Sequence, residues 1–497
     1  MANMKLEDFK AEYKGKKAAV IGVGISNRPL IKWLYSFGVD ITAFDALGEE
    51  DPSIIKAKEE MKEAGVELKW SLGRDYLRKL TEEDFDIVFK TPKMRYETEE
   101  LSLAKKRGAV LTSEMELFMN LCPSKIIAVT GSDGKTTTTT IISEIVKKAG
   151  KRVFLGGNIG TPLLDQVGNM NEDDVAVLEL SSFQLLGMRK SSDIAVITNI
   201  TPNHLDFHKD YQEYIDSKKN IFLYQGPSGR VVLNSACDLT YDMRNEARGK
   251  VCLFALDKDD TLRDPDEEKL TRAYVKDGML CYEDKNGVVP IISEKDIFIP
   301  GSHNVQNFLA AALATYGIAT ADDIACVARE FKGVPHRIEF IREIDGVRYY
   351  NSSIDTSPNR TINTMKALAS RGEKGVLIAG GADKKCIYDG LGDAILSVCD
   401  RIILYGSNAG FIKDILAKES RGREYKVFEI ESVDGDVYEF ENTRESVVDA
   451  YKEALSIARQ NAKPGEIVIM SNVGTSYDHF RHFEHRGDMF RDLVLGM

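Results

Sequence analysis

The segment at residues 126–140 constrains the fold more strongly than any other part of the sequence. An apolar, β-branched run at residues 126–130 predicts a strand that leads directly into Gly131. After the loop Gly-Ser-Asp-Gly, apolar residues recur at helical spacing until Gly150, which predicts a helix that ends there. A strand, a glycine-containing loop and a helix in this order indicate an α/β fold with the loop at the end of a strand.

The loop between this strand and this helix has the residues of a phosphate-binding site. Gly134 permits a tight turn, so that successive backbone N–H groups face one concavity and bind phosphate oxygens. Lys135 supplies a positive charge for the terminal phosphates, and the Thr136 hydroxyl suits Mg²⁺. A phosphate bound there would also lie at the positive end of the helix dipole.

The spacing of the loop, GxxGKT, is two residues shorter than the general GxxxxGK[ST] pattern. The alternative interpretation is a plain strand-to-helix turn that carries a surface lysine. The order of strand, glycines, Lys-Thr and helix favours an ATP site over that alternative. The predicted ATP contacts in the loop are Gly131, Ser132, Asp133, Gly134, Lys135, Thr136 and Thr137.

Length, charge and cysteine content narrow the class of protein. At 497 residues, the chain is long enough for roughly three domains of ~150 residues each. A net charge of −12 without a basic block argues against a nucleic acid or an anionic membrane as partner. The seven cysteines include no CxxC pair, and the sequence has neither an apolar leader nor a run of ~18 apolar residues. We therefore expect a cytoplasmic protein with reduced cysteines, without nucleic-acid or membrane partners.

The first predicted domain, residues 1–122, begins with a strand, a glycine turn and a helix. Residues 18–22 predict the strand, and a second strand at residues 39–44 leads into Asp45. Asp45 follows the glycines by about 20 residues, which is typical of an acidic residue that binds a ribose. The GxGxxG fingerprint is incomplete, however, because Asn27 occupies the place of its third glycine. A nucleotide-diphosphate site and a plain tight turn therefore both remain open for this domain.

The second predicted domain, residues 123–335, contains the phosphate loop and two further polar strand ends. Glu179 lies near the end of one apolar run that predicts a strand, and His204 follows a second such run. The carboxyl ends of parallel strands meet at one edge of a sheet, so both side chains are expected near the bound phosphates. A carboxylate and an imidazole could complete Mg²⁺ coordination beside Thr136. Each could alternatively be an ordinary hydrogen-bonding residue at a strand end.

The third predicted domain, residues 336–497, alternates strands with helical segments, which implies another Rossmann-like sheet. Its predicted strands are residues 347–350, 375–379, 401–405 and 467–470. Two charged segments have no assigned chemistry. Residues 238–298 predict an antiparallel edge and insertion of the second domain, and residues 424–445 predict an acidic strand–loop excursion of the third.

Several motifs resemble those of the Mur ligase family, most closely those of its D-glutamate-adding branch. They follow the family's order and cover nearly the whole chain, and the last two support the D-glutamate branch. The matching segments are residues 130–137 (TGSDGKTT), 157–160 (GNIG), 179–185 (ELSSFQL), 198–206 (TNITPNHLD), 301–307 (GSHNVQN), 335–339 (PHRIE), 380–384 (GGADK) and 476–487 (SYDHFRHFEHRG).

The resemblance implies an α/β protein of three domains. These are a Rossmann-like domain that binds UDP, a central P-loop ATPase-like domain with a mostly parallel sheet, and a C-terminal Rossmann-like domain that binds an amino acid. It further implies that ATP phosphorylates the carboxylate of UDP-N-acetylmuramoyl-L-alanine, as in the synthesis of peptidoglycan precursors. D-Glutamate then attacks the acyl phosphate through a tetrahedral intermediate. The implied cofactors are ATP and two Mg²⁺ ions, and the implied state is a monomer.

The same resemblance gives individual residues expected roles. Lys135 would neutralise charge on the transferring phosphoryl group. Thr136 and Glu179 would bind one Mg²⁺, and His204 would bind a second. Lys218, which nothing else in the sequence singles out, corresponds to a lysine that the family carries as a carbamate beside the metals. The expected catalytic residues are Lys135, Lys218 and His204, and the expected metal ligands are Thr136, Glu179, His204 and Lys218.

The substrate contacts implied by the resemblance come from all three domains. Nucleotide contacts outside the phosphate loop correspond to Asn304, Asn307 and Arg337. Contacts of the UDP-linked substrate correspond to Ile25, Ser26, Asp45, Asn158, Ser181 and Gln184. Contacts of D-glutamate correspond to Lys384, Ser476 and Phe483, where a lysine and a hydroxyl suit a side-chain carboxylate.

One departure from the family's pattern keeps other functions open. The residue after Asn351 is usually Asp in the family, but it is Ser352 here. Asp355 could take its place if the segment is helical, because residues i and i+3 share a helix face. A nucleotide-sensing protein that has lost catalysis on this scaffold is therefore one alternative. Another Mur-type ligase, for example one that adds L-glutamate, is the second.

Overall fold

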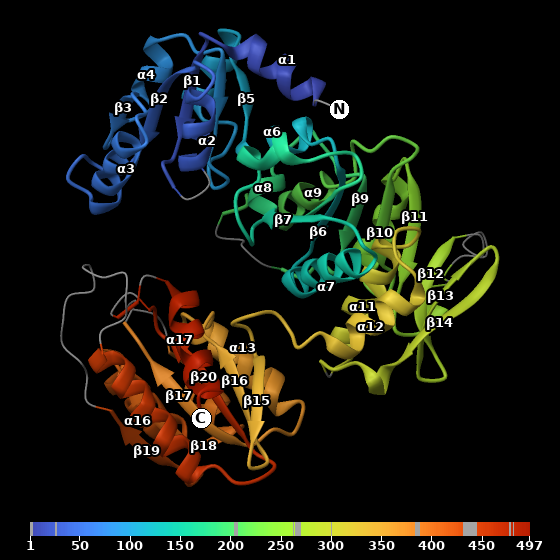
Figure 1. The fold of residues 1–497 in the computed structure, drawn as a ribbon, viewed down its shortest axis with the longest axis vertical. Helices are drawn as coiled ribbons and strands as arrows, with labels where there is room; N and C mark the ends of the chain where they lie inside the picture. The colour runs from blue at the N-terminus through green and yellow to red at the C-terminus, as the bar shows by residue number, and fades with distance from the viewer. Residues whose placement is uncertain are drawn as a thin grey trace. The chain divides into compact units, whose positions relative to one another are not determined.

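The computed structural model describes residues 3–24, 27–202, 207–261, 263, 270–299, 301–382, 388–430, 445–476, 479–480 and 482–497. The chain forms two compact units, Met1–Phe331 and Lys332–Met497. Among the described residues, strands form three sheets of five, nine and six strands. Figure 1 shows the first sheet in blue, the second in green to yellow and the third in orange to red. The predicted α/β class with mostly parallel sheets is confirmed.

The first sheet is parallel, with the strand order β3-β2-β1-β4-β5. Its strands are β1 (Lys17–Ile21), β2 (Asp40–Asp45), β3 (Lys69–Leu72), β4 (Ile87–Phe89) and β5 (Val110–Thr112). Its helices are α1 (Met4–Tyr13), α2 (Asn27–Tyr35), α3 (Pro52–Glu63), α4 (Arg78–Glu82), α5 (Glu99–Lys106) and α6 (Glu114–Leu121). The strand order reverses between β1 and β4, so a ligand is expected beyond the carboxyl ends of these two strands.

The second sheet has the strand order β14-β13-β12-β11-β10-β9-β6-β8-β7. Its strands are β6 (Lys125–Thr130), β7 (Val153–Gly157), β8 (Val175–Glu179), β9 (Ile194–Ile197), β10 (Arg230–Asn234), β11 (Lys250–Phe254), β12 (Thr271–Lys276), β13 (Met279–Asp284) and β14 (Gly287–Ser293). Its helices are α7 (Lys135–Lys148), α8 (Ser182–Leu185), α9 (Tyr211–Lys219), α10 (Asp238–Asp242), α11 (Ser302–Ala314) and α12 (Ala321–Glu330). Because β6 pairs in parallel with both β8 and β9, the carboxyl ends of these strands, with Glu179 at the end of β8, share one edge of this sheet.

The prediction for residues 238–298 was partly wrong. β12, β13 and β14 do form an antiparallel meander at the edge of the sheet, as predicted. However, β11 pairs in parallel with β10, and β12 pairs in parallel with β11, so the segment continues the central sheet instead of being an insertion. The apolar run in β11 is too short for its periodicity to indicate a parallel strand. The strand predicted from the apolar run before His204 is β9, which ends at Ile197.

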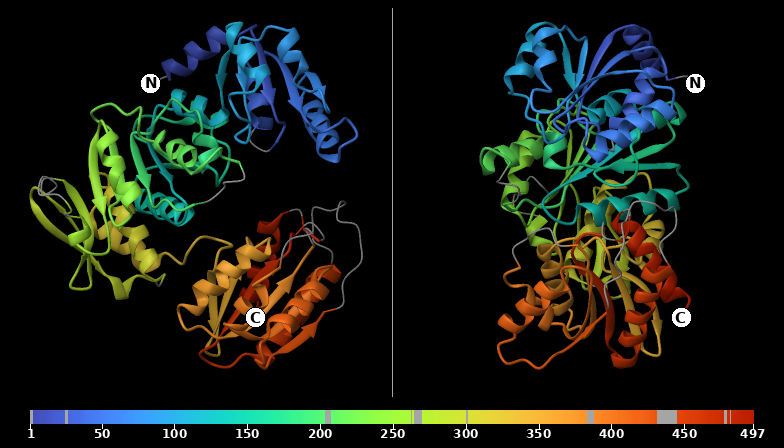
Figure 2. Two further views of the ribbon diagram at one scale, coloured as in Figure 1. Left: turned by 180° about the vertical axis from the view of Figure 1, so that it is seen from behind. Right: turned by 90° about the vertical axis from the view of Figure 1, so that its left-hand side faces the viewer.

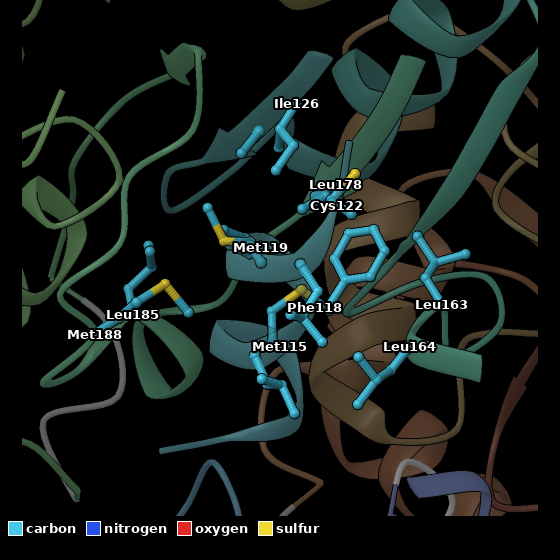
Figure 3. Packing of buried hydrophobic residues seen from close by; sticks show 14 of the residues in the cluster. Met115, Phe118, Met119, Cys122, Ile126, Leu163, Leu164, Leu178, Leu185 and Met188 are labelled. Carbon is cyan, nitrogen blue, oxygen red and sulfur yellow. The ribbon is translucent and has the colours of Figure 1, made fainter. Parts of the chain in front are cut away.

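One apolar core joins the first two sheets within the unit Met1–Phe331. It contains buried residues of α1, α2 and α6 together with residues of β1, β6 and β8. Figure 3 shows part of this core, in which Phe118 of α6 lies close to Leu163, Leu178 and Cys122. Shared burial of this kind gives the two sheets a common source of hydrophobic stabilisation.

The unit Lys332–Met497 contains the third sheet, with the order β15-β16-β20-β17-β18-β19. Its strands are β15 (Glu339–Ile344), β16 (Val347–Ser352), β17 (Gly375–Gly380), β18 (Cys399–Tyr405), β19 (Lys426–Glu429) and β20 (Ile467–Val473). Its helices are α13 (Pro358–Ala369), α14 (Leu391–Leu396), α15 (Ala409–Glu419), α16 (Glu445–Asn461) and α17 (Phe483–Leu495). Figure 2 shows helices on both faces of this sheet, which accounts for two separate apolar cores.

All four strands predicted for the third sheet are present, as β16, β17, β18 and β20. β15, which pairs antiparallel with β16, was not predicted. β19 begins the predicted acidic excursion, and residues 431–444 of that excursion lie outside the described residues.

The described cysteines agree with the prediction of reduced thiols. Cys122, Cys237, Cys252, Cys281, Cys326 and Cys399 are all free, and four of the six are buried. Over the described part of the chain, no helix combines the length and the apolar character that crossing a bilayer would require.

We predict that Gly375→Ala destabilises the unit Lys332–Met497. A Cβ on Gly375 would lie 1.9 Å from the backbone oxygen of Ile467 on the neighbouring strand β20. Forcing these strands apart should lower the free energy of unfolding by about 1–3 kcal/mol. Gly410→Ala is the matched control, because a Cβ there has open space in α15 and should leave stability unchanged or slightly raised. Thermal unfolding of the two full-length variants checks this, and equal apparent Tm values would contradict it.

Candidate active site

The phosphate loop, residues 131–134, connects the end of β6 to the first residue of α7. Gly134 precedes the helix with a φ of 76°, in the left-handed region that favours glycine. The backbone N–H groups of Ser132 and Asp133 donate to the main-chain and side-chain oxygens of Asn199, at 3.0 and 2.9 Å. The N–H groups suited to a phosphate are therefore those of the first turn of α7, which have no acceptor within the helix.

Two lysine side chains converge on one carbonyl of this loop. Lys135 Nζ donates to Gly131 O at 3.0 Å and to Ser132 O at 2.9 Å. Lys218 Nζ, from α9, donates to the same Gly131 oxygen at 2.8 Å and lies 3.4 Å from Thr130 Oγ1. Two ammonium groups on one neutral oxygen repel each other, and a bound anion would relieve that repulsion.

Lys218 is buried, with 2% of its surface exposed. Burial, and then the positive charge of Lys135, lowers the pKa of the Lys218 amine to about 7, although the negative charge of Glu179 acts in the opposite direction. The Lys218 Nζ also lies 4.7 Å from the centre of the Tyr214 ring. At neutral pH, a substantial fraction of this amine is therefore uncharged.

Glu179 ends β8 and is 1% exposed. Its Oε1 accepts a hydrogen bond from Asn158 Nδ2 at 2.8 Å, whereas its buried Oε2 has no hydrogen-bond partner among the described residues. A buried carboxylate oxygen without a donor is costly unless a cation faces it. Because Mg²⁺ prefers carboxylate, hydroxyl and phosphate oxygens, this donor fits the predicted metal site.

The two asparagines predicted near the nucleotide do lie beside the phosphate loop. Asn304 and Asn307 are buried in the first turns of α11, where Asn307 Nδ2 donates to Asn304 Oδ1 at 3.3 Å. Asn307 Oδ1 accepts a hydrogen bond from Thr138 of α7 at 3.1 Å. A Cβ on Gly134 would lie 2.7 Å from the same Asn307 oxygen, so glycine is needed there for space as well as for φ.

Asp45 organises the glycine turn at the edge of the first sheet. Its Oδ2 accepts from Val23 N at 2.8 Å, and its Oδ1 accepts from Leu47 N at 3.1 Å. Asn27, in place of the third glycine, donates to the carbonyls of Ile21 and Gly22 at 3.0 and 2.8 Å. Asp45 and Asn27 thus hold residues 21–23 by hydrogen bonds at the point where the strand order reverses.

Ser181 and Gln184 hydrogen-bond each other at the start of α8. They form a capping box in which Gln184 N donates to Ser181 Oγ at 3.3 Å and Ser181 N donates to Gln184 Oε1 at 3.0 Å. Both residues follow β8 directly and therefore lie close to Glu179 in the chain. Their side chains have a structural role here whether or not they also contact a substrate.

In the unit Lys332–Met497, Arg337 lies between two residues with unusual backbone angles. His336 and Ile338 have φ angles of 65° and 47°, which are uncommon for residues other than glycine. Ser476 is 2% exposed, and Phe483 is the first residue of α17, with its ring centre 6.0 Å from that of His336.

Four predicted site residues, Ile25, Ser26, His204 and Lys384, lie outside the described residues. Within the described residues, no group of three or more His, Cys, Asp or Glu side chains is arranged to hold a metal ion. The support for a metal site therefore comes from the buried Glu179 Oε2, which has no hydrogen-bond partner among the described residues. It does not come from a complete set of ligands.

The condition under which Asp355 could replace the family's Asp is not met. Residues 353–354 form a turn rather than a helix, with Asp355 N bonded to Ser352 O at 3.0 Å. The Asp355 carboxylate instead accepts a hydrogen bond from Ser471 Oγ at 2.7 Å, and burial raises its pKa. The helical condition is therefore not met, but the turn still brings the Asp355 carboxylate into hydrogen-bonding contact with the Ser352 side chain.

Two residues that hold the site together were not singled out from the sequence. Tyr214 OH hydrogen-bonds Ser132 Oγ at 2.8 Å, and its ring lies against Lys218. The spacing of four between Tyr214 and Lys218 on a helix could have indicated this, because such residues share a face. Asn199 organises the loop through contacts that only the folded chain brings together.

Known proteins resemble this chain in sequence and in fold. Residues 129–315 match the family model described as the Mur ligase middle domain. The chain is 44% identical to the UDP-N-acetylmuramoylalanine–D-glutamate ligase of Acetivibrio thermocellus and 43% identical to that of Ruminiclostridium cellulolyticum. In both comparisons, 99% of this chain and 99% of the relative are covered.

Solved structures share the fold at low identity. The UDP-N-acetylmuramate-alanine ligase MurC of Thermotoga maritima matches with a TM-score of 0.53 and 17% identity, covering 97% of this chain and 99% of that one. MurF of Acinetobacter baumannii matches with a TM-score of 0.52 and 16% identity, covering 83% of this chain and 91% of that one. Because the relatives above 40% identity extend over the full length, the chain belongs to the Mur ligase family, in the group of UDP-N-acetylmuramoylalanine–D-glutamate ligases.

Proposed function

We propose that this chain forms an amide bond between UDP-N-acetylmuramoyl-L-alanine and D-glutamate, with ATP as the energy source, in peptidoglycan precursor synthesis. The observation that carries the proposal is the convergence of Lys135 and Lys218 on Gly131 O, beside the unpartnered oxygen of Glu179. The full-length similarity to UDP-N-acetylmuramoylalanine–D-glutamate ligases supports this choice of small-molecule substrates.

The proposed reaction has two chemical steps. A carboxylate oxygen of the UDP-linked substrate attacks the γ-phosphorus of ATP, the bond to the bridging oxygen breaks, and ADP leaves. The amine of D-glutamate then attacks the acyl carbon to form a tetrahedral intermediate. That intermediate expels phosphate, which keeps the original carboxylate oxygen, and the amine loses a proton. The Lys135 ammonium, at the first residue of α7, stabilises the negative charge that the phosphoryl group carries between donor and acceptor.

The proposal includes Mg²⁺ held by Thr136, Glu179, His204 and a modified Lys218. When bound, Mg²⁺ would neutralise phosphate charge. An ammonium cannot ligate a cation, so Lys218 would have to carry a carbamate, formed when its uncharged amine attacks CO₂ and loses a proton. The lowered pKa of Lys218 supplies that uncharged amine near neutral pH. A carbamate would also remove the like-charge contact with Lys135.

The remaining assignments belong to the same proposal. We propose two Mg²⁺ ions, a monomer, and domain boundaries after residues 122 and 335. Nucleotide contacts are assigned to residues 131–137 with Asn304, Asn307 and Arg337. The UDP-linked substrate is assigned to Ile25, Ser26, Asp45, Asn158, Ser181 and Gln184, and D-glutamate to Lys384, Ser476 and Phe483.

A phosphate-release panel tests the proposed function. The purified chain is given ATP, Mg²⁺ and UDP-N-acetylmuramoyl-L-alanine with D-glutamate, L-glutamate, L-lysine or diaminopimelate. We expect phosphate release with D-glutamate that stops when any one substrate is omitted. Release with L-glutamate alone would identify a different ligase, and ATP binding without release would favour a nucleotide sensor.

We predict that Lys135→Ala abolishes turnover while the fold remains intact, because glycines and Asn199 determine the loop's conformation. Losing such a charge contact should lower kcat by roughly 10²-fold or more. Lys147→Ala is the matched control, since Lys147 is on the same helix but pairs at the surface with Glu144 and should change little. Steady-state phosphate release measures both variants, and a Lys135→Ala enzyme with more than roughly a tenth of wild-type turnover would refute the role.

We also predict that Lys218→Ala is inactive and is partly rescued by short carboxylates such as formate or acetate. A carboxylate could occupy the space of the carbamate and restore a negative charge there. Lys219→Ala is the control, because the neighbouring Lys219 pairs with Asp216 and Glu246 instead of facing the loop. Phosphate-release rates measured with and without added carboxylate test this prediction. A Lys218→Ala enzyme that is active without carboxylate, and that carboxylate does not stimulate, would contradict the proposed carbamate.

A further inference from the structure

The loop after β4, residues 90–98, touches both sheets of the unit Met1–Phe331. It begins at the carboxyl end of β4, beside the glycine turn, because a Cβ on Gly22 would lie 3.2 Å from Thr91 Cβ. Further along the loop, the Tyr96 ring packs on Gly187, which follows α8, and a Cβ on Gly187 would lie 2.4 Å from that ring. The loop therefore extends from the point where the strand order of the first sheet reverses to the segment after α8 of the second.

Arg95, in this loop, forms a bidentate ion pair with Glu213 of α9. Its Nη1 donates to Glu213 Oε2 at 3.0 Å, and its Nη2 donates to Glu213 Oε1 at 2.5 Å. The Arg95 guanidinium also lies 5.9 Å from the centre of the Phe207 ring, and its Nε lies 3.5 Å from Glu97 in the same loop. The Arg95 and Glu213 side chains are 25% and 17% exposed. A bidentate pair that is largely shielded from water is stronger than an ordinary surface salt bridge.

Glu213 is fixed at the start of α9 by hydrogen bonds of its own. Its backbone N–H donates to Asp210 Oδ1 at 2.8 Å, and its Oε2 accepts from Lys209 N at 2.8 Å. The hydrogen bonds from Arg95 lower the pKa of Glu213 to about 2, although burial acts in the opposite direction. Both partners of the ion pair are therefore charged near neutral pH.

The helix that Arg95 contacts is also the one that faces the phosphate loop. Tyr214, next to Glu213 in the chain, hydrogen-bonds Ser132 Oγ at 2.8 Å, and its ring centre lies 4.7 Å from Lys218 Nζ. Arg95 thus connects the glycine-turn end of the first sheet to a helix that contacts the phosphate loop of the second.

The proposed UDP-linked substrate needs both of these sheets. Its UDP end is assigned to the first sheet, at Asp45, whereas its carboxylate is assigned to the second sheet, where Ser181 and Gln184 follow β8. A ligand that is held at two places binds well only when the two places keep a fixed separation and orientation.

We infer that Arg95 is a positioning residue that, through Glu213, keeps the first sheet and α9 aligned so that the UDP-linked substrate occupies both ends of its site at once. The inference rests on the proposed function, because it takes UDP-N-acetylmuramoyl-L-alanine as the ligand that spans the two sheets. A residue that only stabilised the fold would not distinguish this ligand from its UDP fragment.

The test compares, by isothermal titration calorimetry, the Kd values of the complete UDP-linked substrate, of UDP alone and of a non-hydrolysable ATP analogue. We expect Arg95→Gln to raise the Kd of the complete substrate roughly tenfold, because the two ends of the site lose their alignment. UDP alone and the ATP analogue each bind one sheet, so their Kd values should stay within about twofold of the wild type. Glu213→Gln removes the same contact from the other side and should give the same pattern.

Double variants and a control show whether the ion pair itself is responsible. Arg95→Gln combined with Glu213→Gln should raise the Kd of the complete substrate no further than either change alone. Arg95→Glu combined with Glu213→Arg reverses the pair and should restore part of the affinity. Arg78→Gln is the matched control, because Arg78 pairs with Glu82 at 2.6 Å within α4 and does not join the two sheets.

The outcomes separate the inference from the proposed function. If the wild-type chain does not bind UDP-N-acetylmuramoyl-L-alanine, the proposed function fails and the inference fails with it. If the wild type binds this substrate, and Arg95→Gln and Glu213→Gln either leave its Kd unchanged or weaken UDP alone as much, the inference alone is overturned. Thermal unfolding of each variant confirms that the Kd values come from folded protein.

Discussion

The candidate site depends on one shared acceptor, the carbonyl oxygen of Gly131, to which both Lys135 and Lys218 donate. Gly131 has a φ of 147°, and a Cβ there would lie 2.0 Å from Thr198 Oγ1, so the loop can follow this path only with glycine. Two ammonium groups on one oxygen each disfavour the charge of the other, which contributes to the lowered pKa of Lys218. Either a phosphate or a carbamate would relieve this repulsion, so the loop is arranged for negative charge.

The three sheets also place other polar groups where parallel strands end. The second sheet places Glu179 and the phosphate loop at the ends of paired parallel strands, and the first sheet orders its glycine turn through Asp45. In the third sheet, Arg486 links the segments after β16 and β20. Parallel sheets collect strand ends on one side, which is why each of the three sheets offers polar backbone and side chains there.

Local patterns were sufficient for much of the fold and for the phosphate loop. The strand, glycines and helix around Gly131 and Gly134 were predicted because apolar periodicity and glycine constraints are local. The strand β15 and the parallel β11 were missed, since a short apolar run does not reveal its partner. The helix expected around Asp355 is a turn, and this turn buries the carboxylate against Ser471 and the Ser352 side chain. Contacts of Asn199, Tyr214 and Arg486 join distant segments, so no local pattern could have predicted them.

The central claim is that this site activates a carboxylate by transferring a phosphoryl group to it. The most direct measurement uses UDP-N-acetylmuramoyl-L-alanine labelled with ¹⁸O in its carboxylate, and follows the label by mass spectrometry after turnover with ATP and D-glutamate. The account predicts that one ¹⁸O atom per turnover appears in inorganic phosphate and that the other remains in the new amide. Inorganic phosphate free of ¹⁸O, with amide product formed, would contradict it.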